Sequence, residues 1–84
     1  MNNTYQIYLI SDSTGETLDR IFLALKAQFK NFDYKIHQCS FTRTENQILK
    51  IIELAKKQKE PIILYTIVDD KLAKYLEERS KKYN

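Results

Sequence analysis

The sequence predicts a small α/β domain in which helices flank a three-stranded parallel sheet. Segments rich in β-branched and aromatic residues alternate with segments of helical apolar spacing, in the order β-α-β-α-β-α. The connections are short, and right-handed crossovers place each helix against an apolar face of the sheet. For three such units the commonest strand order is 2-1-3. At 84 residues the chain forms a single domain, residues 1–84.

The first strand is expected over residues 5–10, which are mostly β-branched or aromatic. Residues 11–17, Ser-Asp-Ser-Thr-Gly-Glu-Thr, follow as a turn and capping cluster. A helix that ends near Lys30 or Asn31 comes next. Its apolar residues recur at steps of three and four and share one face: Leu18, Ile21, Phe22, Leu25 and Phe29.

The second strand is expected over residues 34–41. Thr44 and Gln47 then have the spacing of a capping box, in which the threonine side chain accepts from the Gln47 N–H and the glutamine reaches back. A second helix, to about Lys59, is therefore predicted. Its apolar positions are Ile48, Leu49, Ile51, Ile52 and Ala55.

Pro61 separates this helix from residues 62–68, a continuous apolar run broken only by one threonine. Such a run is typical of a strand buried on both faces of a parallel sheet. Asp69 and Asp70 are candidate caps for a third helix. Its inner side is predicted to carry Leu72, Ala73, Tyr75 and Leu76.

Composition excludes several classes of protein. No apolar stretch approaches the about 20 residues of a membrane-spanning helix, and the N-terminus has neither a signal nor a transit-peptide pattern. The net charge is +3, but 14 basic residues are interspersed with 11 acidic ones, which does not indicate a nucleic-acid surface. A single cysteine, Cys39, agrees with the reducing cytoplasm. The expectation is a cytoplasmic protein that binds neither membrane nor nucleic acid.

The polar cluster after the first strand has the components of a phosphate site. Hydroxyls, a glycine that permits close backbone approach and the N–H groups of a helix N-terminus occur together. Arg43, just past the second strand, offers a fork of donors. The candidate phosphate-binding residues are Ser13, Thr14, Gly15, Glu16, Thr17 and Arg43. The alternative is that Ser13 with Glu16, and Thr14 with Thr17, only cap the helix.

Asp12 and Asp69 follow the first and third strands and are expected at the same edge of the sheet. Together they are candidate ligands of Mg²⁺, which binds carboxylates and phosphate oxygens. Helix capping is the alternative for Asp69. His37 and Cys39 lie two apart on a strand, but no further ligand is suitably spaced. They are interpreted as packing or surface residues.

Three blocks occur in the sequence in this order: residues 7–17 with Ser-Asp-Ser-Thr-Gly-Glu-Thr, residues 41–44 with Phe-Thr-Arg-Thr, and residues 64–69 with Leu-Tyr-Thr-Ile-Val-Asp. They resemble the N-terminal part of the regulatory proteins of pyruvate, phosphate dikinase and phosphoenolpyruvate synthase. The resemblance covers nearly the whole chain but only the first third or so of a family member. It implies a bifunctional ADP-dependent Ser/Thr kinase and phosphate-dependent pyrophosphorylase that modifies a threonine of its target.

The resemblance also implies what this chain lacks. The family's P-loop lies in its C-terminal part, and no such motif occurs among these residues, which include one glycine. ADP and inorganic phosphate are expected cofactors of the full-length family, and Mg²⁺ is a further candidate, but none of them is expected to bind this chain tightly. The expected partners are the dikinase or synthase and the missing C-terminal part, and the fragment by itself is expected to be inactive.

Two alternatives to this regulatory reading follow from the residues. A non-catalytic α/β module would hold a phosphorylated ligand or partner at the first helix. A receiver-like phosphoacceptor would use Asp12 and Asp69, although the later strands of that fold are absent from the sequence.

The strand expected over residues 62–68 is too apolar for a natural sheet edge, and this predicts self-association or marginal stability of the chain.

Overall fold

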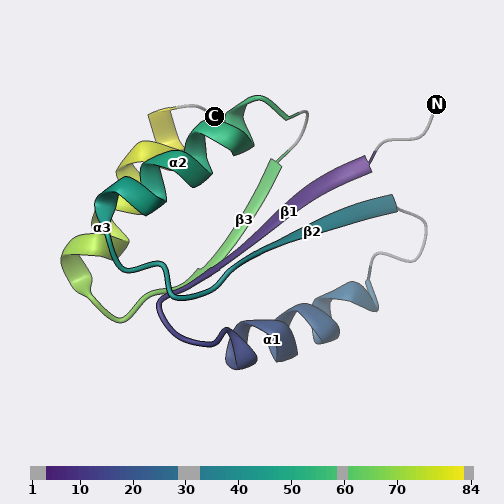
Figure 1. Ribbon diagram of the computed structural model, residues 1–84. Helices are drawn as coiled ribbons and strands as arrows, with labels where there is room; N and C mark the ends of the chain where they lie inside the picture. The colour runs from purple at the N-terminus through teal and green to yellow at the C-terminus, as the bar shows by residue number, and fades with distance from the viewer. Residues whose placement is uncertain (1–3, 29–32, 59–60, 83–84) are drawn as a thin grey trace.

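The computed structural model describes residues 4–28, 33–58 and 61–82 and shows the predicted α/β fold (Figure 1). Within these residues, three strands alternate with three helices. The elements are β1 (Thr4–Ser11), α1 (Glu16–Lys26), β2 (Asp33–Cys39), α2 (Glu45–Lys56), β3 (Pro61–Thr66) and α3 (Asp70–Lys82). All strand pairs are parallel and the order is β2-β1-β3, as predicted.

The central strand, β1, contributes alternate side chains to two separate cores. Tyr8 and Ile10 point to the face covered by α2 and α3, where they pack with Ile48, Ile52 and Leu76. On the opposite face lies α1, and a smaller core is formed there by Ile7, Leu9, Leu18 and Phe22. Figure 1 shows this three-layer arrangement, with α1 on one side of the sheet and the other two helices on the opposite side.

Several predicted boundaries differ from the observed ones. The second strand ends at Cys39 rather than at residue 41, and the third ends at Thr66. Val68, predicted as strand, is 84% exposed in the loop before α3. The first two helices end earlier than the predicted positions near residues 30–31 and 59. Helix α1 ends at Lys26, with Ala27 as its C-cap, and α2 ends at Lys56, with Lys57 as its C-cap. Phe29, predicted on the apolar face of the first helix, lies outside the described residues.

The burial predicted for the third strand is wrong in degree. Its side chains after Pro61 are half-buried, not fully buried on both faces. The reason is its position, because β3 pairs with β1 on one side and with no strand of the described ranges on the other. A strand at the side of a sheet leaves part of each side chain accessible even when helices lie above and below it.

The N-terminus of α2 shows the predicted capping box. Thr44 accepts from the Gln47 N–H at 3.2 Å, and the Gln47 side chain accepts from the Thr44 N–H at 3.0 Å. Replacing Thr44 by alanine removes the first of these bonds and should lower the free energy of unfolding by about 1 kcal/mol. Urea denaturation followed by circular dichroism measures this loss. A Thr44→Ser variant, which keeps the hydroxyl, should lose less, and equal losses would contradict the capping role.

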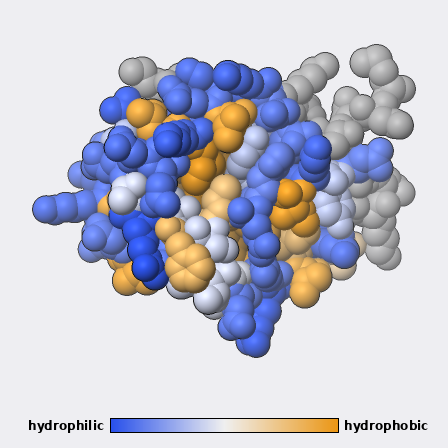
Figure 2. All heavy atoms as spheres, in the orientation of Figure 1, coloured by the Kyte–Doolittle hydropathy of each residue, from blue (hydrophilic) through white to orange (hydrophobic). Residues whose placement is uncertain are grey.

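The molecular surface is mainly hydrophilic on the face shown in Figure 2, with separate apolar patches between the polar side chains. Within the described ranges, none of the helices has the length and apolar character needed to cross a membrane.

Candidate phosphate-handling site

Three loops meet at the carboxyl edge of the sheet, where β1, β2 and β3 all end. The β1–α1 and β2–α2 loops are joined by backbone bonds from Thr42 N–H to the Ser11 carbonyl (2.8 Å) and from Phe41 N–H to the Ser13 carbonyl (2.9 Å). The β3–α3 loop is joined through Asp12, whose Oδ2 accepts from the Val68 N–H at 2.8 Å. The predicted proximity of the first and third loops is therefore confirmed.

The base of this site is a small buried polar cluster. Ser11 and Thr42 are both almost completely inaccessible to solvent. The Ser11 hydroxyl accepts from the Ser13 N–H at 3.1 Å and lies 3.2 Å from the Ser13 hydroxyl, while the Thr42 hydroxyl donates to the Cys39 carbonyl at 2.9 Å. Because these polar groups are paired, the loops keep a defined shape without desolvated, unsatisfied atoms.

Gly15 is the N-cap of α1, with φ 87° in the left-handed region. The helix has no side-chain cap at this end in the described part of the chain, so the predicted capping by Ser13 or Thr14 is wrong. Ser13 instead bonds within the β1–α1 loop, and the Thr14 carbonyl accepts from the Ser40 hydroxyl at 3.0 Å. The first N–H groups of α1 are consequently not satisfied by a capping side chain and carry the positive end of the helix dipole.

Replacing Gly15 by alanine should destabilise the domain by about 1–2 kcal/mol, because a left-handed conformation is strained for any residue with a Cβ. The added Cβ would lie 3.4 Å from the Ser40 hydroxyl, an ordinary van der Waals contact, so the cost comes from the backbone conformation and not from a clash. Thermal unfolding of the variant tests this. Asparagine tolerates positive φ better than alanine, so the Gly15→Asn variant should lose less stability than Gly15→Ala. An unchanged melting temperature in the alanine variant would contradict the left-handed backbone conformation of Gly15.

Arg43 is held beside the loops by two contacts. Its Nε donates to the Asp12 carbonyl at 3.0 Å, and its guanidinium carbon lies 5.2 Å from the centre of the Phe41 ring. Phe41 adopts a positive φ of 56°, unusual for a residue other than glycine. The turn thus presents an aromatic face to the guanidinium, and one donor of the arginine is committed to the backbone while the others remain on the exposed side of the group.

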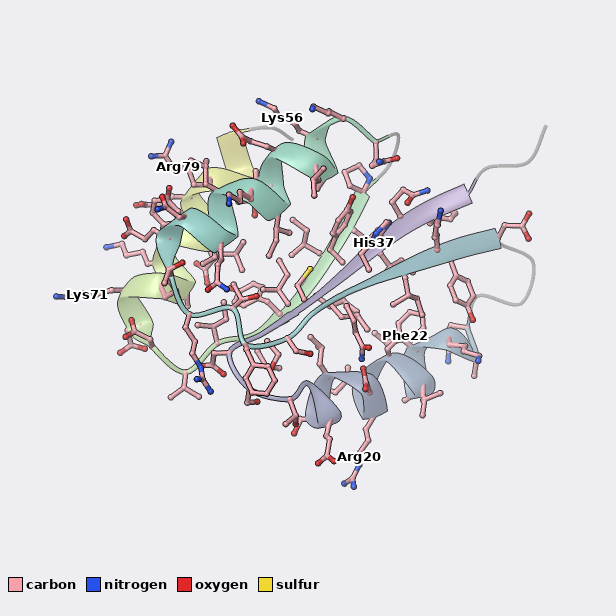
Figure 3. The ribbon with its side chains drawn as sticks, viewed as in Figure 1. Arg20, Phe22, His37, Lys56, Lys71 and Arg79 are labelled. Carbon is pink, nitrogen blue, oxygen red and sulfur yellow. The ribbon has the colours of Figure 1, made fainter. Side chains whose placement is uncertain are left out.

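A surface hollow of about 290 Å³ lies between the second and third loops. It is lined by Asp12, Arg43, Glu45, Asp69, Lys71 and Leu72. Figure 3 shows Lys71 extending outward from α3, whereas Arg43 bonds directly to the β1–α1 loop. Of the predicted phosphate-binding residues, only Arg43 lines this hollow, and residues 13–17 at the start of α1 do not.

Asp12 and Asp69 each use one carboxylate oxygen in the fold. Asp12 accepts from Val68, and Asp69 Oδ1 accepts from the Leu72 N–H at 3.0 Å, which makes Asp69 a cap of α3. Both nevertheless line the same hollow. Among the described residues, no group of three or more His, Cys, Asp or Glu side chains is placed to hold a metal ion. Mg²⁺ at these two aspartates would therefore need phosphate oxygens and water as its other ligands.

The side chains of His37 and Cys39 take no part in this site and have packing roles, as interpreted from the sequence. The His37 ring stacks on Tyr8, with centroids 4.4 Å apart, and its Nε2 lies 2.7 Å from the Gln6 side-chain oxygen. Cys39 packs against the larger core, and burial raises the pKa of its thiol. A thiol with a raised pKa is poorly ionised and is a weak nucleophile.

Sequence reasoning missed two contributors to the site. Phe41 was assigned to the second strand, although it forms the positive-φ turn beneath Arg43. Thr42 was given no role, although it joins two loops from a buried position. The presence of a threonine after a predicted strand does not indicate that its side chain is buried or that its backbone bonds to another loop. Both become visible only when the parallel register places the ends of β1 and β2 side by side.

The fold and site together define a parallel α/β domain with a polar surface hollow at the carboxyl ends of its strands, the usual ligand position in open sheets. The sequence matches the kinase/pyrophosphorylase family over residues 7–84. The chain belongs to this family.

Several relatives are named as pyruvate, phosphate dikinase regulatory proteins. One from Pelagibacter ubique (strain HTCC1062) is 70% identical over 76 residues, which is 90% of this chain and 28% of the relative. A second, from Geotalea uraniireducens (strain Rf4), is 48% identical over 84% of this chain and 26% of its own length. The chain therefore spans little more than a quarter of these relatives, in their N-terminal part.

Proposed function

We propose that this chain is the N-terminal part of a bifunctional regulator of pyruvate, phosphate dikinase, acting in ADP-dependent threonine phosphorylation and in phosphate-dependent removal of that phosphate. Phosphoenolpyruvate synthase is the alternative target. The observation that supports this most is the joining of the family's three sequence blocks into one site, through bonds from Thr42 to Ser11, from Arg43 to Asp12 and from Val68 to Asp12.

The proposed role of the site is to hold a phosphate group during transfer, not to bind the nucleotide. The uncapped N-terminus of α1 and the guanidinium of Arg43 are donors suited to phosphate oxygens. Phosphoryl transfer also requires a cradle for the nucleotide phosphates, usually with a metal ion. No P-loop sequence occurs in these 84 residues. We therefore assign ADP binding to the larger remainder of the family's chain.

The test uses two proteins, the 84-residue chain and a chimera in which it replaces the matching N-terminal part of the Pelagibacter relative. The chimera should phosphorylate the dikinase in the presence of ADP and remove the phosphate when inorganic phosphate is supplied. The chain alone should do neither. Transfer of radiolabelled phosphate to the dikinase threonine is the measurement. Robust transfer by the chain alone, lost in Asp12→Asn, would contradict the division of roles.

A non-catalytic binding module is the second candidate function. It is favoured by the small, open hollow and because the carboxylates of Asp12 and Asp69 already accept hydrogen bonds from backbone N–H groups. In that case the chimera would fold and bind phosphate or the dikinase, but replacing the site residues would alter binding without changing the rate of transfer.

A further inference from the structure

The two outer strands of the sheet differ in chemical character. β2 has the sequence Asp-Tyr-Lys-Ile-His-Gln-Cys, with charged residues near its start and exposed positions along its length. β3 has the sequence Pro-Ile-Ile-Leu-Tyr-Thr and contains no charged residue. Natural edge strands are protected by charges, bulges or proline. By this criterion β2 has the character of an edge strand. In β3, Pro61 at the start of the strand is the sole feature of this kind.

Helices cover β3 on both of its faces. Tyr65 donates a hydrogen bond from its hydroxyl to Glu77 of α3, which places that helix over one face. On the other face, Ile62 and Leu64 pack against the core formed with α1. A parallel strand covered on both faces is normally an interior strand of its sheet, paired along both edges. In the described structure β3 is paired only with β1.

The connection rules give the direction in which the sheet would continue. The crossover from β2 to β3 carries the chain past β1 by way of α2, and α3 packs on the same face as α2. A right-handed crossover that starts at β3 and uses a helix on this face must continue in the same direction. It leads to a position beyond β3, next to the unpaired edge. Figure 1 shows α3 beside α2, already on the face that such a connection requires.

The side of α1 that faces this position is apolar and partly exposed. Asp19, Leu23 and Lys26 line a hollow with Ile36 of β2 and therefore mark the β2 side of the helix. At about 3.6 residues per turn, Ile21 and Leu25 lie on the opposite side, toward β3. They are 42% and 37% exposed. The outer edge of β3 together with Ile21 and Leu25 is here called the β3-edge surface. It combines backbone groups that pair with no strand of the described residues with an adjoining apolar strip.

We propose that the β3-edge surface pairs with a parallel β-strand supplied by the larger part of the regulator chain, the part of the relatives that this sequence does not span. This rests on the proposed function, because it assumes that the domain works with that remainder. The relatives extend well beyond the matched 26–28% of their length, so a polypeptide of the required size exists in each of them. A second copy related by a two-fold axis would bring β3 edges together antiparallel, in conflict with the direction that α3 sets.

Amide hydrogen exchange of β3 tests this pairing. The isolated 84-residue chain is compared with the same chain after addition of the separate larger part of the Pelagibacter relative, and with the chimera. Alternate amides of β3 should become protected by at least about tenfold in both cases, because new inter-strand hydrogen bonds must open before exchange. The amides of β2 should not change.

A matched pair of substitutions on α1 gives a second readout. Ile21→Lys places a charge on the β3-edge surface and should weaken binding of the separate larger part at least about tenfold. Leu23→Lys, on the same helix but on its β2 side, should change binding by less than about twofold. Titration calorimetry with the two variants provides the comparison, and circular dichroism confirms that both remain folded.

Three results would overturn the proposal. The first is protection of β2 rather than β3, and the second is protection in neither the mixture nor the chimera. The third is protection of β3 in the isolated chain that rises with its concentration, which would assign the surface to a second copy. These outcomes are separate from the proposed function, because the chimera can show β3 protection without transferring phosphate, and can transfer phosphate without β3 protection.

Discussion

Replacement of Arg43 by alanine in the chimera should lower the rate of phosphate transfer to the dikinase by about 100-fold, the effect typical of removing one preorganised donor from a developing negative charge. Arg43 is preorganised by the Asp12 carbonyl, which accepts from its Nε, and by the Phe41 ring. Lysine keeps the charge but cannot reproduce the planar fork. Arg43→Lys should therefore recover only part of the rate.

Arg20 offers the matched control. It lies on the exposed side of α1, and Figure 3 shows its side chain extending away from the sheet. Arg20→Ala removes the same charge from the domain without touching the three loops. Single-turnover rates of transfer should be unchanged in this variant. If both alanine variants reduce the rate equally, the effect comes from the lower net charge of the domain. The proposed contact of Arg43 with the transferred phosphate would then be contradicted.

The largest effect on stability is expected for Ile48→Ala. Ile48 is 0% exposed and lies in the core between β1, α2 and α3. Truncating a buried isoleucine to alanine costs about 2–5 kcal/mol, through lost burial and the cavity left behind. A domain of this size has a total stability of about 4–13 kcal/mol. We expect the variant to be partly or wholly unfolded at 37 °C, as measured by circular dichroism and urea denaturation.

Leu54 is the control within the same helix, because it is 56% exposed. Leu54→Ala should change the free energy of unfolding by about 0.5 kcal/mol or less. The pair separates burial from helix propensity, since both changes introduce alanine into α2. Similar losses for the two variants would mean that α2 does not present Ile48 to the sheet.

The fold class and strand order could be predicted because each element carries a local signal. The step of three and four residues in α1, the capping box at Thr44 and the apolar run after Pro61 each specify an element without knowledge of the others. Because the connections are short and the crossovers are right-handed, only a few strand orders are compatible with these elements. Boundaries were less predictable. The strand signal of Val68 continues past Thr66, but Asp12 binds the Val68 N–H and turns the chain out of the sheet.

The candidate site could be predicted only in part, because its contacts join residues far apart in the sequence. Gly15 and Arg43 are recognisable by residue type and by their position after strands. The contact of Arg43 with Asp12 joins two different loops and depends on strand register. The uncapped start of α1 was also not predictable, since Ser13 and Thr14 have the composition of caps and only the left-handed Gly15 excludes them from that role.

Titration of the isolated chain with inorganic phosphate, followed by amide chemical shifts, tests the central claim of a phosphate-handling site most directly. Phosphate should move the signals of Gly15, Glu16 and Thr17 together with those of the guanidinium N–H groups of Arg43 that do not bond to Asp12, weakly and less at higher salt, because these donors are partly exposed. Pyrophosphate should produce the same pattern. Shifts confined to Lys56 and Lys57 at the end of α2, with Gly15 and Glu16 unchanged, would contradict the claim and leave the β1–α1 loop with a structural role alone.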